Sequence, residues 1–309
     1  MRNIILDCDP GHDDAIAILL AGSNSEINLL GVTVVAGNQT LEKTANNALK
    51  VVQWLGLDVP VFKGCQGPMV REQMIADDIH GKTGLDGHDF GEIKIKLQEE
   101  HAVNFIIDTI LNSKEKITVV TCGPMTNLAM ALRLQPKIKE NIEEIVLMGG
   151  AYTFGNVSPA AEFNIIADAE AAYVCFTAGL PITMMGLDVT RKVQVLPEVV
   201  ERMDKNSNKA AKMFVNLMKF FNKSQKEVFG WDGGPLHDPL TVAYLIDPSV
   251  VTLKKMNTRI DIRSTDSYGR TNCDYFDYLG LEKNSNVAID VDVEKYWDII
   301  EEGIRNYND

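Results

Sequence analysis

The sequence predicts an α/β protein with a Rossmann-like open sheet, mostly parallel and flanked by helices, and with a small antiparallel C-terminal extension. Over residues 1–190, short apolar strand segments alternate with segments of helical periodicity, and that alternation is typical of parallel β-α units. Several predicted strands run directly into glycine, asparagine or aspartate. Because ligands bind at the carboxyl ends of the strands in open α/β sheets, we expect a functional site at that edge.

Each element follows from the spacing of its apolar residues. Strands are expected over residues 2–6, 27–36, 59–62, 117–121, 144–148 and 182–185. Helices are expected over residues 15–21, 40–55, 103–111, 125–134 and 168–177, and the region 196–246 also has a helical pattern. In the tail we expect antiparallel strands over residues 256–262, 269–273 and 286–291, and a closing helix over residues 293–307.

The chain has 309 residues and lacks repeats, low-complexity segments and Pro/Gly/Ser-rich linkers. A single domain over residues 1–309 is therefore expected. The net charge of −13 argues against nucleic-acid backbones and anionic membranes as partners. No run approaches the roughly 20 apolar residues that a membrane span needs.

Cysteine usage and the N-terminal sequence indicate the compartment. The five cysteines are widely spaced and form no C-x-x-C pair, which suits reduced thiols. The first residues lack the basic and long apolar regions of a signal peptide. We therefore expect a cytoplasmic protein.

An acidic cluster follows the first predicted strand. Asp7, Asp9, Asp13 and Asp14 lie within eight residues, where the strand gives way to a helix. Like charges this close repel unless a cation holds them, and oxygen-only ligands favour calcium or magnesium over zinc. Alternatively, Asp13 and Asp14 only stabilise the positive end of a helix and Asp7 caps a turn, but this leaves Asp9 unexplained. The cluster predicts a hard divalent cation.

A second informative segment is Gly-Gly-Pro-Leu-His-Asp-Pro at residues 233–239. Asp238 is a natural N-cap with Pro239 at the first helical position, and a structural cap explains both residues. It does not explain His237 or the paired glycines. An aspartate at this place can also ligate a metal, and a histidine beside it can donate a proton.

Polar residues also follow the predicted strand at 144–148. Asn156, Glu162 and Asn164 surround an apolar turn after two glycines. Amides and a carboxylate in such a loop can bind several hydroxyl groups at once, and sugars carry several hydroxyl groups. A hydrogen-bonded surface turn is the alternative.

Residues 66–98 form the longest stretch without clear periodicity. Acidic residues and histidines lie among its glycines, namely Asp77, Asp78, His80, Asp86, His88 and Asp89. A long polar loop in a compact domain is often a lid over a site, and a merely solvated loop is the alternative.

Five motifs in this order resemble the nucleoside hydrolase family, of the inosine-uridine preferring type. They are D-C-D-P-G-H-D-D at 7–14, V-A-G-N at 35–38, C-G-P-M-T-N at 122–127, A-E-F-N at 161–164 and P-L-H-D at 235–238. Together they span nearly the whole chain, and the surrounding text is most similar to the bacterial pyrimidine-specific ribonucleoside hydrolases. The resemblance implies the nucleoside hydrolase fold and hydrolysis of the N-glycosidic bond of ribonucleosides, with uridine and cytidine expected as substrates in nucleoside salvage. It also implies a homo-oligomer, a tetramer or a dimer.

The resemblance further implies roles for particular residues. A calcium ion would be held by Asp9, Asp14, the main-chain carbonyl of Cys122, and Asp238, with the ribose 2′- and 3′-hydroxyls completing its shell. Ribose contacts are expected from Asp13, Asn38, Asn156, Glu162 and Asn164, and base contacts from His80, His237, Gln225 and Phe229. Phe229 stands where a tyrosine is expected near the base. Trp231 adds aromatic surface there or only packs the loop.

The chemistry of N-glycoside cleavage suggests roles for three of these side chains. The transition state is oxocarbenium-like, and the reaction needs an activated water and a stabilised leaving group. Asp9 is the candidate general base that activates the water. His237 or His80 is the candidate that protonates or hydrogen-bonds the departing nucleobase. Two other functions remain open from the residues alone. Strand-end D-x-D also opens haloacid-dehalogenase-like phosphotransferases, and the same scaffold could serve as a non-catalytic nucleoside-binding protein.

Overall fold

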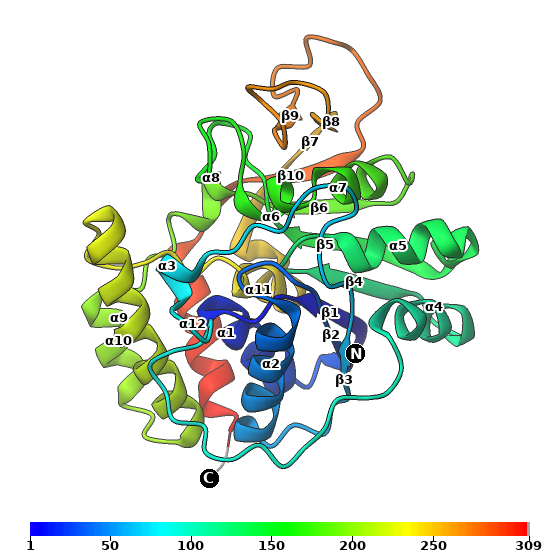
Figure 1. The fold of residues 1–309 in the computed structure, drawn as a ribbon. Coiled ribbons are helices and arrows are strands. Elements are labelled where there is room, and N and C mark those ends of the chain that lie inside the picture. The colour runs from blue at the N-terminus through cyan, green and yellow to red at the C-terminus, as the bar shows by residue number, and fades with distance from the viewer. Residues whose placement is uncertain (308–309) are drawn as a thin grey trace.

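An eight-stranded sheet forms the centre of the molecule, with helices on both faces (Figure 1). The computed structural model describes residues 1–307, except for the side chains of Asp77 and Asp78, so these two residues of the predicted lid loop lie outside the described side chains. The strand order is β3-β2-β1-β4-β5-β6-β10-β7. These strands are β1 (Arg2–Cys8), β2 (Ile27–Val34), β3 (Val61–Lys63), β4 (Ile117–Thr121), β5 (Ile142–Met148), β6 (Ile182–Met185), β7 (Val251–Met256) and β10 (Ser285–Val291).

The strands from β3 to β6 are all parallel, as the β-α alternation predicts. Strand β1 lies between β2 and β4, and β5 follows β4. The carboxyl ends of these four strands therefore share one edge of the sheet. The predicted fold class is confirmed, and so is the gathering of the polar strand-end residues on that edge.

Helices cover the two faces of the sheet in two groups (Figure 1). One face is covered by α1 (His12–Ser23), α2 (Leu41–Leu55), α9 (Pro197–Asp204), α10 (Lys209–Phe229), α11 (Pro239–Ile246) and α12 (Val293–Arg305). The other is covered by α4 (Ala102–Asn112), α5 (Thr126–Leu134) and α7 (Ala169–Phe176). Alternation along β1 serves both cores, because Ile4 and Leu6 pack on the first face and Ile5 on the second.

Short helices complete the chain. They are α3 (Asp77–His80), α6 (Phe163–Ala167), α8 (Leu187–Thr190), η1 (Pro136–Asn141) and η2 (Pro248–Val250). Helix α3 is the one helix that interrupts the predicted loop over residues 66–98. It packs against α10, and this contact places His80 beside the carboxyl edge of the sheet.

The tail differs from its prediction in two respects. Strands β7 and β10 pair in antiparallel fashion, but β10 also pairs in parallel with β6. The tail therefore completes the main sheet, and β7 begins before the strand expected over residues 256–262. Only β8 (Thr258–Ile260) and β9 (Thr271–Cys273) form a separate antiparallel pair, which projects from the body at the top of Figure 1.

None of the described helices combines the length and the apolar character that a bilayer crossing requires.

Candidate active site

A cavity of about 570 Å³ opens at the carboxyl edge of the sheet. Its wall comes from the β1–α1 turn, the end of β2, α3, the loop after β5, α10 and the turn before α11. Except for Asp9 and Asp14, the predicted site residues all line it: Asp13, Asn38, His80, Cys122, Asn156, Glu162, Asn164, Gln225, Phe229, His237 and Asp238. Residues from distant parts of the chain thus meet around one cavity.

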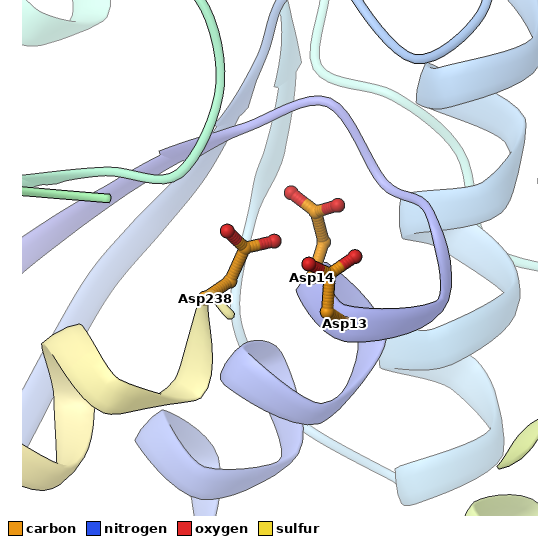
Figure 2. Close-up of side chains that lie close together, drawn as sticks. All are labelled: Asp13, Asp14 and Asp238. Atoms are coloured by element: carbon orange, nitrogen blue, oxygen red, sulfur yellow. The ribbon is translucent and has the colours of Figure 1, made fainter. Parts of the chain in front are cut away.

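Three buried carboxylates converge at the base of this cavity. Asp13 and Asp14 come from the first turn of α1, and Asp238 comes from the start of α11 (Figure 2). One carboxylate oxygen from each lies within 4.8 Å of the others. Asp238 occupies the N-cap position of α11, but its side chain makes no capping hydrogen bond. A structural cap therefore does not account for this aspartate.

The fourth carboxylate, Asp9, lies directly beside the cluster. The backbone N–H of Asn38 donates to Asp9 Oδ2 at 2.6 Å, and the backbone N–H of Asp9 donates to Asp14 Oδ1 at 3.2 Å. A Cβ atom on Gly37 would come within 2.1 Å of Asp9 Oδ2, and one on Gly123 within 2.5 Å of Oδ1. Two strand-end glycines thus leave just enough room for this carboxylate.

Burial raises the pKa of all four of these carboxyl groups, and repulsion from neighbouring carboxylates adds to the rise in Asp9, Asp14 and Asp238. Burial, followed by repulsion from Asp14, raises the pKa of Asp9 well above its usual range. The pKa of Asp238 is raised in the same way by burial and by Asp13. Burial also raises the pKa of Asp13 to about 6, and burial together with Asp13 raises the pKa of Asp14 to about 7. A nearby positive charge would lower these pKa values and allow the four carboxylates to ionise together.

The donor set fits a hard divalent cation. Among the side chains that the structure describes, Asp9 Oδ1 and Asp13 Oδ1 are buried without a hydrogen-bond partner. Unpaired buried carboxylate oxygens are costly, and a cation with oxygen ligands would satisfy them. The tightest cluster contains Asp13, which the sequence assigned to ribose, whereas Asp9 lies just outside it.

Cys122 lies at the end of the next strand along the sheet. Its carbonyl accepts a hydrogen bond from Asn164 Nδ2 at 3.1 Å. Its thiol points instead toward α11, 3.5 Å from Thr241 Oγ1. Only the main-chain oxygen of Cys122 is therefore directed at the polar end of the cavity.

Asp7 does not belong to the cluster, which corrects the grouping of four neighbouring carboxylates at residues 7–14. Asp7 accepts hydrogen bonds from Thr33 Oγ1 at 2.6 Å and from Asn127 Nδ2 at 2.8 Å. Side chains alternate along a strand, so Asp7 points to the same face of the sheet as Ile5. It joins β1 to β2 and α5, and it does not cap a turn.

The loop after β5 brings the next polar residues to the cavity. Glu162 is the N-cap of α6 and accepts from the backbone N–H groups of Asn164 and Gly150, each at 2.9 Å. Burial raises the pKa of Glu162 to about 7. Asn156 is exposed, and its Oδ1 accepts from Phe163 N. The turn is hydrogen-bonded, as the alternative supposed, yet its polar residues also face the cavity.

Two histidines line the opposite part of the wall. His80 Nδ1 lies 3.3 Å from the backbone nitrogen of His12 and 3.2 Å from its Nδ1. His237 Nδ1 lies 2.7 Å from Thr190 Oγ1. Burial, aided by repulsion from Arg191, lowers the pKa of His237 to about 3. His237 is therefore neutral near pH 7.

Aromatic side chains and an amide complete this part of the wall. Phe229 stacks on Trp231 with ring centres 4.8 Å apart, and both line the cavity. Trp231 therefore contributes to the cavity and does not only pack the loop. Gln225 is buried, and its Oε1 has no hydrogen-bond partner in the described part of the chain.

Helix α8 is the part of the site that the sequence reasoning missed. Asp188 accepts from the backbone N–H of Tyr152 at 2.7 Å, and Arg191 donates to the carbonyl of Gly155 at 2.6 Å. Thr190 contacts His237, as described above. The available signal was Gly186 directly after the strand at 182–185, followed by Asp188, Thr190 and Arg191, which resembles the pattern at the other strand ends.

The family model of the inosine-uridine preferring nucleoside hydrolases matches residues 4–298. The chain belongs to the nucleoside hydrolase family. The pyrimidine-specific ribonucleoside hydrolases RihB of Escherichia coli O17:K52:H18 and of Shigella sonnei are each 49% identical over 306 residues, covering 99% of this chain and 98% of the relative. The chain is therefore a ribonucleoside hydrolase, and the phosphotransferase and binding-protein alternatives are set aside.

Solved structures of nucleoside hydrolases share the whole architecture. The purine-preferring ribonucleoside hydrolase from Gardnerella vaginalis superposes with a TM-score of 0.92 at 35% identity, covering 98% of both chains. A plant nucleoside hydrolase, PpNRh1, has a TM-score of 0.92 at 29% identity, covering 98% of this chain and 99% of the other. Relatives named for purines and for pyrimidines thus share this fold.

Proposed function

We propose that this ribonucleoside hydrolase prefers pyrimidine ribonucleosides, uridine and cytidine, and that it requires Ca²⁺. The preference is supported by the 49% identity to enzymes named as pyrimidine-specific, against 35% to one named as purine-preferring. The single observation that carries the metal-dependent mechanism is the convergence of three buried carboxylates within 4.8 Å at the base of the cavity.

The ion would be held by Asp9, Asp14, the carbonyl of Cys122, and Asp238. Support comes from their oxygen-only chemistry, from their common place at the sheet edge and from the unpartnered Oδ1 of Asp9. Asp13 lies close enough to Asp14 and Asp238 to compete for the same role. When bound, calcium would orient the two ribose hydroxyls and lower the pKa of a water molecule beside them.

Asp9 is the proposed general base. Its Oδ2 is fixed by the Asn38 N–H, while Oδ1 has no partner among the described residues and can accept a proton from water. The ribose would be held by hydrogen bonds with five side chains that line the cavity: Asp13, Asn38, Asn156, Glu162 and Asn164. Fixing the sugar in this way places its anomeric carbon near the water that Asp9 activates, which lowers the entropic cost of the attack.

The departing base would be stabilised at the other end of the cavity. His237 and His80 line that wall, and Gln225 and Phe229 would contact the base. Because His237 is neutral near pH 7, it would act through a hydrogen bond from its ring N–H to a pyrimidine carbonyl oxygen. This role suits a leaving group whose negative charge spreads onto that oxygen.

The test is a set of steady-state constants for uridine, cytidine and inosine, with a chelator and after addition of Ca²⁺ or Mg²⁺. We expect uridine and cytidine to have the highest kcat/KM, the chelator to abolish turnover, and Ca²⁺ to restore it. A preference for inosine would contradict the proposed substrate class. Full activity in the chelator would contradict the metal requirement.

The His237→Ala variant tests the leaving-group role. It should lower kcat on uridine roughly 10²- to 10³-fold, the range for loss of one hydrogen-bond donor to a developing negative charge, while the calcium affinity stays near that of the wild type. Undiminished turnover on every natural nucleoside would dismiss the role.

Two further proposals concern the setting of the enzyme. A reducing cytoplasm is supported by five free cysteines within the described chain. A homo-oligomer, a tetramer or a dimer, is supported by the general prevalence of closed symmetric assemblies and by exposed apolar side chains between β9 and β10, including Phe276 and Tyr278. Light scattering of the purified protein tests the assembly.

A further inference from the structure

We propose that Thr190 is a positioning residue that holds His237 in a single tautomer, with the ring proton on Nε2. This inference rests on the proposed function, in which His237 assists the departing base. Thr190 ends α8 and His237 lies in the turn before α11, so the fold alone brings the two side chains together. The inference extends the site to a residue that lies behind His237 and does not line the cavity.

The contact itself is short and partly buried. Thr190 Oγ1 lies 2.7 Å from His237 Nδ1, and Thr190 has no exposed surface. Within the described chain, this ring nitrogen is the one hydrogen-bond partner of the hydroxyl. A buried hydroxyl hydrogen needs an acceptor, since leaving it unpaired is costly.

Counting hydrogens then selects the tautomer. If His237 Nδ1 carried a proton, it would donate to Oγ1, and the hydroxyl hydrogen of Thr190 would be left without an acceptor. A doubly protonated ring has the same defect. If Nδ1 carries a lone pair, Thr190 donates to it and both groups are satisfied. A neutral imidazole has one N–H, so the proton then lies on Nε2.

This tautomer supplies what base departure needs. The Nδ1 side of His237 faces Thr190, and the residue lines the cavity, so Nε2 is the ring nitrogen that remains for a bound base. When the bond from C1′ to the base nitrogen breaks, its electron pair passes to the base and spreads onto a carbonyl oxygen. Nε2–H donates a hydrogen bond to that oxygen, and the base takes up its proton from solvent afterwards.

His80 lacks this arrangement. Its Nδ1 faces both the backbone N–H and the Nδ1 of His12, and among the described residues no hydroxyl bonds to the ring. These contacts do not select one tautomer. Of the two histidines on the wall, the structure therefore assigns the fixed donor to His237.

A spectroscopic experiment tests the tautomer without reference to activity. The calcium-loaded protein is labelled with ¹⁵N-histidine, and the ring nitrogens of His237 are assigned by their loss in His237→Gln. We expect a protonated Nε2 and an unprotonated Nδ1 in the wild type and in Thr190→Ser. In Thr190→Val the two tautomers should mix. A proton on Nδ1 in the wild type would overturn the proposal.

A kinetic experiment tests the consequence. Thr190→Val should lower kcat on uridine roughly tenfold, the size of one lost hydrogen bond. It should leave hydrolysis of p-nitrophenyl riboside almost unchanged, because nitrophenolate leaves without a donor. Thr190→Ser should restore uridine turnover. Equal losses on both substrates, or no loss on uridine, would overturn the kinetic role.

Controls separate this inference from general damage and from the proposed function. Thr183→Val removes the hydroxyl of another buried threonine, which lies outside the cavity and donates to Glu144 at 3.2 Å. This variant should hydrolyse both substrates at the wild-type rate. Thermal unfolding shows that each variant is folded. If His237→Ala hydrolyses uridine normally while His237 of the wild type has the expected tautomer, His237 has no role in catalysis. The kinetic role of Thr190 would then be wrong as well.

Discussion

At the residue scale, neighbouring carboxylates have opposite fates. Asp7 and Asp9 are two residues apart and equally buried, and one oxygen of each, Asp7 Oδ2 and Asp9 Oδ1, has no hydrogen-bond partner in the described chain. They differ in place: Asp7 Oδ1 bonds to Thr33 and Asn127, whereas Asp9 lies beside Asp14 and the backbone of Asn38. The contacts of Asp7 hold it on the face of the sheet that carries α5, away from the carboxylate cluster. Asp9 is left with an oxygen available for chemistry, which is why it is the proposed base.

Substitution of these two aspartates distinguishes their roles. Asp9→Asn keeps the shape of the side chain but cannot take a proton from water, so kcat on uridine should fall by roughly 10²- to 10⁴-fold. Asp7→Asn is the matched control and should retain kcat within about twofold. Steady-state kinetics of both variants, with melting temperatures as a check on folding, decide the matter. Near-normal turnover by Asp9→Asn would exclude it as the base.

At the element scale, helix α8 organises the loop that follows β5. Asp188 and Arg191 bind the backbone of residues 152–155, and Arg191 also lies 4.8 Å from the ring centre of Phe154. The loop then turns back on itself, since the Gly155 N–H donates to the carbonyl of Pro159 at 3.1 Å. This tight turn presents Asn156 and Glu162 to the cavity.

The close approach inside this loop gives a sharp prediction. A Cβ atom on Gly155 would lie 2.0 Å from the backbone oxygen of Ala161, so Gly155→Ala must push the two halves of the loop apart. We expect KM for uridine to rise roughly tenfold with a smaller change in kcat, as expected when substrate contacts are lost. Gly67→Ala is the control, because no atom lies within 4 Å of the added Cβ. Equal kinetics for the two variants would show that the turn does not position the loop.

At the scale of the whole molecule, one sheet draws its strands from both ends of the chain. Strand β1 opens the sequence, and β10, near its end, pairs with β6 in the same sheet. This continuity supports the prediction of a single domain over residues 1–309. It also means that the four carboxylates are held together by the entire fold, so their charge state bears on global stability.

Calcium should therefore stabilise the protein more at high pH than at low pH. The folded pKa of Asp14, about 7, lies above the usual 3.8, and that of Asp13 is raised to about 6. In the metal-free protein their contribution to stability is complete below about pH 4 and is lost as pH rises toward 7. Calcium binds the ionised carboxylates and relieves their repulsion. At a free calcium concentration 100 times its Kd, this binding raises the free energy of unfolding by about 2.7 kcal/mol.

Thermal unfolding with calcium and with a chelator measures this effect. The difference in melting temperature should be clearly larger at pH 8 than at pH 5. A difference that is the same at both pH values would show that the ion does not bind these carboxylates. The Asp14→Asn variant should lose most of the difference at pH 8.

Local patterns in the sequence were sufficient for most of the fold. Hydrophobic periodicity identified the parallel strands and most helices, because the period of two or 3.6 residues depends only on near neighbours. Strand β7 and the pairing of β10 with β6 were missed, since strand order depends on contacts between distant segments. The motifs at the strand ends also predicted part of the cavity wall, because parallel strands carry their carboxyl ends to one edge. His80, Gln225 and Phe229 lie on α3 and α10, and only the family resemblance pointed to them as base contacts.

What the sequence alone determined is thus the run of strands and helices, and it predicted which residues are candidates for chemistry and that a cation site follows the first strand. The tertiary structure decided which of them meet. It turned Asp7 away from the cluster, brought Asp238 beside Asp13 and Asp14, and joined Thr190 to His237. The physical reason is that residue type and local spacing specify an element, whereas the direction of a side chain and its partner depend on how distant elements pack.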